Sequence, residues 1–407
     1  MAASDNTYDI VIAGGGMIGS SLALALAPLG MRIAVVEAVA RRETQQPSFD
    51  DRSTALSRST QRTFEAMGLW DEVVAASTAI SKVHVSDKGR FGFSHIDAEE
   101  QGVEALGYVV INRVLGEVLQ THLYSTAGID VLCPERIEAV QLGLESAIAT
   151  LGNGQSLSAD LLVAADGANS SVREMMGISA QRREYQQRAV VGNVRSEFSH
   201  ENRAFERFTP QGPLAILPIA DARCGFVWTV SEDDAERVLA LDDAEFLQEL
   251  QTQFGNRLGE FTQVGARAAY PLLLSKAVRL TATRSVLIGN AAHGLHPVAA
   301  QGFNLGMRDV AALCDCIADQ LKNGGDPGNA AALDRYAAWR KSDQKKLVQF
   351  TDNLVRLFGS KRPGLRTLRN IGMIGFDLVP GVRTLFAKHT MGLAGELPRL
   401  SRGMPIR

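Results

Sequence analysis

The chain begins with an apolar run, a helical pattern and a second apolar run within its first 37 residues. Residues 10–13 are uniformly apolar and end at a glycine, which is typical of a strand buried in a parallel sheet. Residues 20–29 are rich in Ala and Leu and predict a helix. Residues 32–36 are again apolar and end at Glu37. The pattern therefore predicts a strand–helix–strand unit.

Glycines fill the turn between this first strand and the helix. Gly14, Gly16 and Gly19 have G-x-G-x-x-G spacing. Such glycines allow a tight turn, a close approach of a pyrophosphate and close helix–sheet packing. The N–H groups at the start of the helix attract phosphates, and Glu37 can accept hydrogen bonds from an adenosine ribose. The unit is predicted to bind a dinucleotide, and the motif alone does not separate FAD from NAD.

A second group of predicted strands follows this unit in the chain. Residues 80–93 alternate apolar and polar positions around Lys88-Gly89, which predicts a hairpin. Residues 181–275 predict an antiparallel sheet with a helical pair over residues 233–254. We expect these segments to form a second lobe inserted into the first.

The segments between these insertions belong to the first lobe. Residues 108–119 predict a strand that runs into a helix. Residues 129–165 predict a meander of four antiparallel strands, of which the first covers residues 129–132. The fold class is therefore α/β: a Rossmann-like dinucleotide-binding domain with an inserted antiparallel-sheet domain and a C-terminal helical segment. The expected boundaries are 1–79, 101–180 and 276–340 for the first domain, 80–100 and 181–275 for the second, and 341–407 for the C-terminal region.

Two later apolar strands end in polar residues suited to a nucleotide. One ends at Asp166-Gly167, and because ligands bind at the carboxyl ends of parallel strands we expect Asp166 to face the nucleotide. The other ends at Gly289-Asn290, where the Asn290 amide could bind a ribityl chain. A helix is predicted to begin near Gly302, and its N–H groups could stabilise the electron-rich edge of a flavin.

Other polar residues allow more than one interpretation. Arg52 and Arg113 lie at element junctions, where they could be surface charges or contacts to a flavin. His293 and His296 have no third ligand at suitable spacing, so structural roles are favoured and no metal is expected. The sequence does not single out a catalytic side chain.

Composition fits a soluble globular protein, with 45% hydrophobic and 21% charged residues. No run of 18 apolar residues suggests a spanning helix, and the N-terminus does not resemble a signal peptide. The four cysteines are scattered and predict free thiols in a reducing compartment. A cytoplasmic protein is expected.

Charge is unevenly distributed along the chain. Residues 341–407 contain 13 Lys or Arg and 4 Asp or Glu, a net of +9, whereas the whole chain has a net charge of -3. Apolar segments alternate with basic residues in this region. It could dock on anionic lipid or on a partner enzyme, or it could cover the core as a helical layer with a solvated basic face. No aromatic-basic element supports nucleic-acid binding.

Together the three motifs resemble the class A FAD-dependent aromatic hydroxylases, which have the para-hydroxybenzoate hydroxylase fold. The resemblance covers residues 8–340 and extends to the ubiquinone-biosynthesis branch, most closely its 2-polyprenyl-6-methoxyphenol hydroxylases. The segments that carry it are residues 49–52, 83–87, 203–218, 289–293 and 301–309. Two positions depart from the broad family pattern: Asn290 replaces an aspartate and Ala300 replaces a glycine.

The resemblance implies a set of site residues. FAD would contact Gly14, Gly15, Gly16, Met17, Ile18, Gly19, Glu37, Arg52, Arg113, Asp166, Gly167, Asn290, Gly302, Phe303 and Asn304. The segment from Asp166 to Arg173 would serve both FAD and NAD(P)H. Pro297 would lie beside both the flavin and the substrate ring. Phe208 and Leu217 belong to the apolar residues of the second lobe, which could be core or could line the substrate pocket.

The resemblance also implies the reaction. Hydride would pass from NAD(P)H to FAD, and O2 would form a flavin hydroperoxide that hydroxylates a polyprenylated methoxyphenol in ubiquinone biosynthesis. Because that substrate is mostly hydrocarbon, the protein could be peripheral on the inner face of the membrane or associated with other ubiquinone-biosynthesis enzymes. The alternatives are a sister hydroxylase acting at another ring carbon, a flavin-dependent prenyl reductase or halogenase, and a non-enzymatic assembly role.

Overall fold

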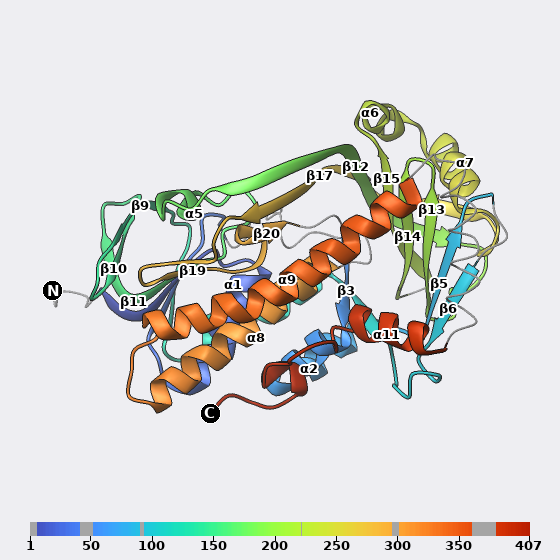
Figure 1. Cartoon of the computed structure of the whole chain (residues 1–407). Coiled ribbons are helices and arrows are strands. Elements are labelled where there is room, and N and C mark those ends of the chain that lie inside the picture. Colours follow the sequence, from blue (N-terminus) through green and yellow to red (C-terminus); the bar gives the residue numbers. More distant parts are fainter. Residues whose placement is uncertain (1–5, 41–51, 90–92, 221, 295–300, 360–379) are drawn as a thin grey trace.

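The computed structural model describes residues 6–40, 52–89, 93–220, 222–294, 301–359 and 380–407 (Figure 1). Two large sheets lie toward opposite ends of the molecule. Two long helices, α8 (Gln301–Lys322) and α9 (Ala330–Gly359), pack side by side, and α9 extends from the first sheet to the second. The mixed α/β class and the helical C-terminal segment are confirmed.

The first sheet contains the dinucleotide unit. In the described residues its path is β18 (Thr281–Ala282), β19 (Ser285–Leu287), β11 (Ser156–Ala164), β1 (Thr7–Ala13), β2 (Ile33–Val36) and β8 (Ile129–Leu132). The strands from β19 to β8 are parallel, and β18 pairs antiparallel with β19. Helix α1 (Met17–Leu26), continued by η1 (Ala27–Leu29), packs on this sheet with α8. The apolar runs are uniformly buried because helices and loops cover both faces.

The predicted four-strand meander was wrong in its first strand. β9 (Ile137–Leu142), β10 (Ala147–Leu151) and β11 form an antiparallel meander as expected. β8 instead pairs parallel with β2. It follows the helix α4 (Asn112–Ser125), and a strand reached through a crossover helix joins a sheet in parallel. Apolar patterning alone does not identify a strand's partner.

The second sheet is largely antiparallel. Its path is β20 (His293–Gly294), β17 (Ala268–Ala277), β12 (Ala180–Ser196), β15 (Arg223–Ser231), β14 (Gly212–Ile219), β13 (Arg203–Thr209), β5 (Lys82–Asp87) and β6 (Phe93–Asp97), with β16 (Phe261–Val264) on β12. β5 and β6 form the predicted hairpin. Helices α6 (Glu232–Ala240) and α7 (Asp243–Phe254) cover one face, α6 through Ala235 and Val238 and α7 through Phe246, Leu250 and Phe254.

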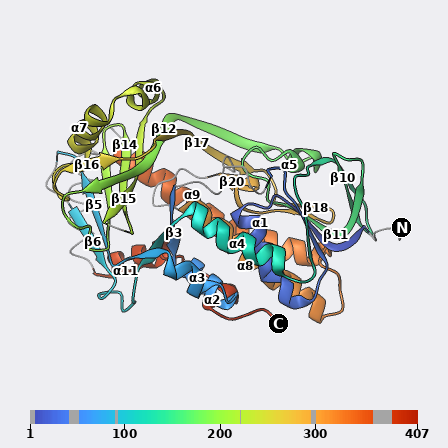
Figure 2. The same cartoon turned by 180° about the vertical axis from the view of Figure 1, so that it is seen from behind.

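A small third sheet links the two large ones. It contains β3 (Ser53–Ser57), β7 (Gly107–Ile111) and β4 (Ser77–Ile80), and it is accompanied by α2 (Arg58–Ala66), α3 (Trp70–Ala75) and α4. Figure 2 shows α4 beside α1, with α2 and α3 below it. Ser53 of β3 lies against the second sheet, since a Cβ added at Gly225 would be 2.4 Å from Ser53 Oγ.

The C-terminal region is built into the fold where it is described. The expected boundary between residues 340 and 341 falls inside α9. Beyond α11 (Pro380–Thr390), Met391 is buried in the same cluster as Ile80 and Leu217. Near the 3-10 turn η4 (Leu400–Arg402), Arg399 Nε donates to Asp315 Oδ1 at 2.7 Å. None of the helices in the described residues has the length and hydropathy needed to cross a bilayer.

Candidate functional site

The three sequence motifs meet where four parallel strands end. Ala13 of β1 pairs with Val36 of β2 and with Ala164 of β11, and Ala164 pairs with Leu287 of β19. The residues that follow these strands therefore share one edge of the first sheet. This edge is the position at which α/β sheets bind nucleotides.

Two glycines let α1 start directly at this edge. Gly14 has φ +100°, and a Cβ there would be 2.6 Å from Ala165 O. A Cβ on Gly19 would be 1.9 Å from Gly14 O, so the first turn of α1 lies against the strand exit. Helix α1 is preceded by Gly16, which has no side chain to cap the N–H groups of Met17, Ile18 and Gly19. These N–H groups can receive phosphate oxygens.

Glu37 is fixed at the end of β2. Its Oε2 accepts from Gly15 N at 2.7 Å, and its Oε1 accepts from Val39 N at 2.8 Å. The residue is only 9% exposed. Since each carboxylate oxygen has a second lone pair, Glu37 can still accept from a ribose hydroxyl.

Asp166 offers the clearest test of whether the residues present fit a bound FAD. Its Oδ2 accepts from Val172 N at 3.1 Å, at the start of α5 (Ser171–Met175). Its Oδ1 is buried without a hydrogen-bond partner among the described residues. Burial raises the pKa of Asp166, although hydrogen bonds from Ser170 and Val172 oppose the rise. Burying a hydrogen-bond acceptor without a donor lowers the stability of the fold. A hydroxyl group of a bound FAD could donate the missing hydrogen bond to Asp166 Oδ1.

Arg173 joins the second motif to the third. Its guanidinium is buried and Nη1 donates to Ala168 O at 3.2 Å and to Ala291 O at 3.1 Å. Ala291 ends the short turn η2 (Gly289–Ala291), where Gly289 has φ +58° and Asn290 is exposed. The Asn290 amide is thus presented at the site edge on a turn held by Arg173.

The start of α8 borders the site where it packs against α1 and η2. A Cβ on Gly306 would be 2.7 Å from Ile18 Cδ1 and 3.4 Å from Gly289 Cα, so α8 lies against both α1 and η2. Gly302 and Phe303 occupy the first turn of α8, as predicted, and Phe303 packs in the cluster that contains Met17 and Ile18. This turn is therefore placed beside the dinucleotide motif.

Asn304 has a structural task that the sequence did not indicate. Its Oδ1 accepts from Ser57 N and from Thr60 Oγ1, both at 2.8 Å. Its Nδ2 donates to Ala55 O, also at 2.8 Å. The side chain therefore fastens α8 to β3 and α2, and its contact with FAD stays a prediction.

The two arginines are placed differently. Arg52 lies just before β3, and its Cζ is 4.3 Å from the centroid of the Tyr270 ring on β17. It thus bridges the third sheet and the second. Arg113 lies in the first turn of α4, is about half exposed, and its Nη1 donates to Glu117 Oε1 at 3.0 Å. FAD contact by either arginine stays a prediction.

The predicted substrate residues share one face of the second sheet where they are described. Phe208 of β13 and Leu217 of β14 lie on the face opposite α6 and α7, and they are 3% and 8% exposed. Pro297 lies outside the described residues. Whether these side chains contact a substrate stays a prediction.

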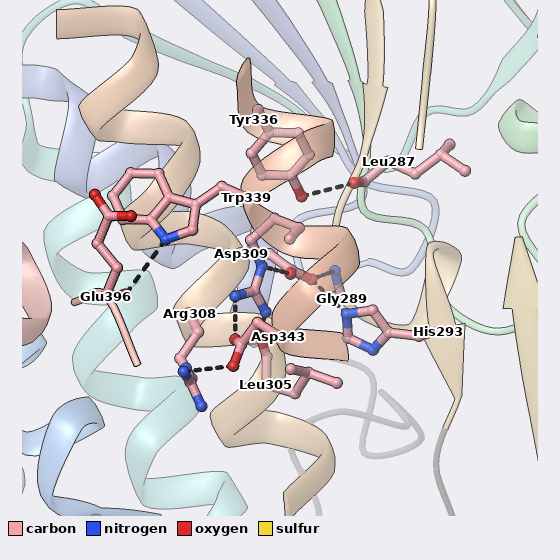
Figure 3. A network of polar contacts seen from close by, with 11 residues as sticks. Leu287, Gly289, His293, Leu305, Arg308, Asp309, Tyr336, Trp339, Asp343 and Glu396 are labelled. Carbon is pink, nitrogen blue, oxygen red and sulfur yellow. Dashed lines mark hydrogen bonds and ion pairs between the residues drawn. The ribbon is translucent and has the colours of Figure 1, made fainter. Parts of the chain in front are cut away.

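A buried ionic network behind η2 was missed from the sequence (Figure 3). Asp309 Oδ2 accepts from Gly289 N at 2.9 Å and from His293 Nε2 at 2.5 Å, and Asp309 Oδ1 accepts from Arg340 Nε at 2.6 Å. Arg340 also pairs with Asp343, whose Oδ1 is 2.6 Å from Arg308 Nη2. The structural role expected for His293 agrees with this geometry. The sequence signal for this network was Asp309, an acidic residue within the mostly apolar segment 305–318.

The network sets the charge of Asp309. Burial alone would raise the pKa of this carboxyl, but His293 and Arg340 lower it to about 2. Asp309 is therefore ionised at neutral pH and can hold both the Gly289 N–H and His293. The turn that carries Asn290 is thus anchored to α8 and α9.

The comparisons with known proteins agree with this geometry. The FAD binding domain family matches residues 7–351. The chain is 39% identical to ubiquinone hydroxylase UbiL of Rhodospirillum rubrum, over 99% of this chain and 94% of that protein. It is 31% identical to 3-demethoxyubiquinol 3-hydroxylase of Escherichia coli, over 95% of this chain and 98% of that protein.

A solved structure shows the same fold. The p-nitrophenol 4-monooxygenase PnpA from Pseudomonas putida DLL-E4 matches with a TM-score of 0.79 and 19% identity, over 96% of this chain and 99% of that chain. The family match and the relatives make FAD the cofactor and NAD(P)H the co-substrate. When bound, the flavin accepts hydride and activates O2. Four adjoining strand ends, full-length relatives and a shared fold lead to one conclusion: the chain belongs to the class A FAD-dependent hydroxylases, in the branch that includes the ubiquinone hydroxylases.

Proposed function

We propose that this enzyme hydroxylates the aromatic ring of a polyprenylated methoxyphenol on the route to ubiquinone. The observation that carries the proposal is the similarity to UbiL, which extends over 99% of this chain. The second supporting observation is the edge of the first sheet, where Glu37, Asp166 and Asn290 follow three parallel strands. A hydroxylase needs such a cofactor site beside an apolar substrate site.

We propose specific tasks for the chain's own residues. The first turn of α1 would bind the pyrophosphate, Glu37 the adenosine ribose, and Asn290 the ribityl chain. Asp166 would accept a hydrogen bond from a hydroxyl of the FAD. The first turn of α8 would stabilise negative charge at the flavin edge, because helix N-termini favour anions. Arg52 and Arg113 would approach the cofactor from outside the first sheet.

Anaerobic mixing tests the proposed reaction directly. The purified protein is mixed with NAD(P)H and a short-chain prenyl methoxyphenol, then given O2, and the products are analysed. We expect faster NAD(P)H oxidation with the phenol present and one added oxygen atom on the ring. A product formed without O2 would indicate a reductase, and halide dependence would indicate a halogenase. NAD(P)H oxidation that the phenol does not change, with no product, would contradict the proposal.

The ring position and the sister-hydroxylase alternative are separate questions. The relatives include a 3-demethoxyubiquinol 3-hydroxylase, whose name gives another substrate and carbon 3 as the position hydroxylated. Product regiochemistry in the same assay distinguishes the two. When both substrates are offered, hydroxylation of the methoxyphenol alone would support the methoxyphenol reaction, and hydroxylation of the demethoxyubiquinol analogue alone would support the sister enzyme.

We further propose that the basic C-terminal region docks on anionic membranes, where a prenylated substrate is concentrated. Supporting this, Lys341, Lys345 and Lys388 are exposed. Truncation at residue 341 is unsuitable as a test, because it would remove Asp343, Arg399 and much of α9. We expect the full-length protein to float with vesicles of anionic lipid and not with neutral vesicles, and the binding to weaken with salt. Equal flotation with both vesicle types would contradict the proposal.

A further inference from the structure

The two faces of the second sheet differ in how tightly they are covered. His84, Phe205, Ile216 and Phe226 form a cross-strand row on the face toward α6 and α7, and they are 4%, 3%, 0% and 1% exposed. The next row along the same four strands points to the other face, because successive side chains alternate. That row is Val85, Glu206, Ala215 and Val227, and all four residues are half-buried.

An incompletely covered row on interior strands indicates a recess. β13, β14 and β15 are each paired on both sides, so these side chains are partly exposed above the sheet and not at its edge, and α9 is the long helix that contacts β13 and β14. Three of the four row residues are small or apolar. Val227 also packs in the cluster that contains Tyr270. The floor of this recess is therefore apolar apart from one carboxyl group, that of Glu206.

The recess opens toward the cofactor side of the molecule. Gly225, two residues from Val227 on the same face, lies against Ser53 of β3. Tyr270, also on this face, stacks with Arg52, which precedes β3. The far part of β3 is held by Asn304 in the first turn of α8. β3 therefore lies between the recess and the proposed position of the flavin edge.

Glu206 has no ion-pair partner or side-chain hydrogen bond among the described residues. Burial raises its pKa to about 7, and no charged group of the described residues contributes to the shift. Glu206 is therefore partly exposed to solvent and yet surrounded closely enough by protein to be desolvated. Both conditions hold for a side chain at the bottom of a recess. The other titratable groups on this face of the described strands include Asp87 of β5, Tyr270 of β17, and Arg195 and Arg223, which pair across β12 and β15.

We propose that Glu206 is the catalytic residue that accepts the hydrogen bond and then the proton of the substrate's ring hydroxyl. The inference rests on the proposed function. The phenol O–H bond breaks as the proton moves to a Glu206 carboxylate oxygen, and the electron pair stays on the phenolate oxygen. That charge makes the ring carbons more electron-rich toward the oxygen donor. The proton returns to solvent or to the product hydroxyl before the next turnover. A single carboxyl in an apolar floor also orients a phenol ring, because no other group of the row can accept its hydrogen bond.

The test compares a short-chain prenyl methoxyphenol with its O-methyl ether, which cannot donate a hydrogen bond. Affinities are measured by calorimetry on the FAD-loaded enzyme between pH 6 and 8.5. We expect the wild type to prefer the phenol by roughly tenfold or more at high pH, since a hydrogen bond to a charged group is strong. The preference should decrease as the pH falls through about 7, where Glu206 takes up a proton.

The Glu206→Gln variant should lose both the preference and its pH dependence. Its hydroxylation rate at pH 8 should be lower by about 100-fold, which is typical of a lost general base. FAD content should be unchanged, since Glu206 lies on the second sheet. Glu260→Gln, an exposed carboxyl at the start of β16, is the matched control and should behave as the wild type.

The outcomes separate the two proposals. A wild type that hydroxylates the phenol but shows no preference over the ether would overturn the role of Glu206 alone. A Glu206→Gln variant that retains the wild-type pH dependence would do the same. A wild type that neither binds nor hydroxylates the phenol would overturn the proposed function, and the role of Glu206 with it. If the variant does not fold, the pH dependence of the wild-type preference decides.

Discussion

Gly19→Ala is expected to weaken FAD binding by roughly 10- to 100-fold, as estimated from the cost of overpacking. The new Cβ would lie 1.9 Å from Gly14 O, 3.1 Å from Gly14 C and 3.3 Å from Ile12 Cγ2. Two of these atoms are backbone, so the overlap is relieved only if the start of α1 moves away from the exit of β1. That movement takes the N–H groups of the first turn away from the pyrophosphate. Flavin absorbance after gel filtration measures the loss.

Gly265→Ala is the matched control for this substitution. Its new Cβ would meet only Asn193 O, at 3.7 Å, which is an ordinary contact distance. Gly265 lies near the second sheet, away from the dinucleotide motif. We expect this variant to retain FAD as the wild type does. Full FAD retention by Gly19→Ala would show that α1 does not position the phosphates.

Asp309→Asn is expected to lower the free energy of unfolding by about 3–5 kcal/mol, which is typical when one partner of a buried ion pair is removed. The variant leaves Arg340, which is 2% exposed, without its carboxylate partner at Oδ1. It also replaces one acceptor at the point where Gly289 N and His293 Nε2 converge. Denaturant unfolding measures the stability, with flavin fluorescence as a second readout for movement of η2.

Because of Asp309, we also expect the free energy of unfolding to decrease at acid pH. The folded pKa of Asp309 is about 2, below the value of about 3.9 expected for an unfolded chain. The stability due to its charge is therefore present above pH 4 and is lost as the pH falls from 4 to 2. The wild type should lose more stability than Asp309→Asn across this window.

Asp243→Asn is a suitable control for charge removal. Asp243 pairs with Arg267 at 3.0 Å, but its side chain is 71% exposed. Its loss should cost no more than about 1 kcal/mol, since exposed ion pairs contribute little. Equal losses in the two variants would contradict the view that the Asp309 network is a buried anchor.

Local sequence predicted the fold well where apolar runs and turn residues agree. The strand at residues 10–13, Gly14, Gly19 and the acid at position 37 fixed the dinucleotide unit because each has a steric or hydrogen-bonding task there. The parallel placement of β8 was missed, because strand pairing depends on the crossover helix before it. The domain boundary at residue 340 was drawn from charge, whereas α9 continues through it.

Side-chain partners far apart in the sequence were the main omission. Asn304 could be recognised by resemblance, but its bonds to Ser57 and Thr60 join residues separated by more than 240 positions. Asp309 and Arg340 are likewise on different helices. Glu206 looked like an ordinary strand residue, and only the register of four strands shows that it stands alone in an apolar row. Such partners are decided by tertiary packing and leave little local signal.

Titration of the flavin-free, full-length protein with FAD tests the central claim most directly. The account predicts saturable binding of one FAD per chain, a yellow complex that survives gel filtration, and a clear loss of affinity in Gly19→Ala but not in Gly265→Ala. A protein that stays colourless after titration, or that binds FAD equally well in all three forms, would contradict the assignment of the four strand ends as a flavin site.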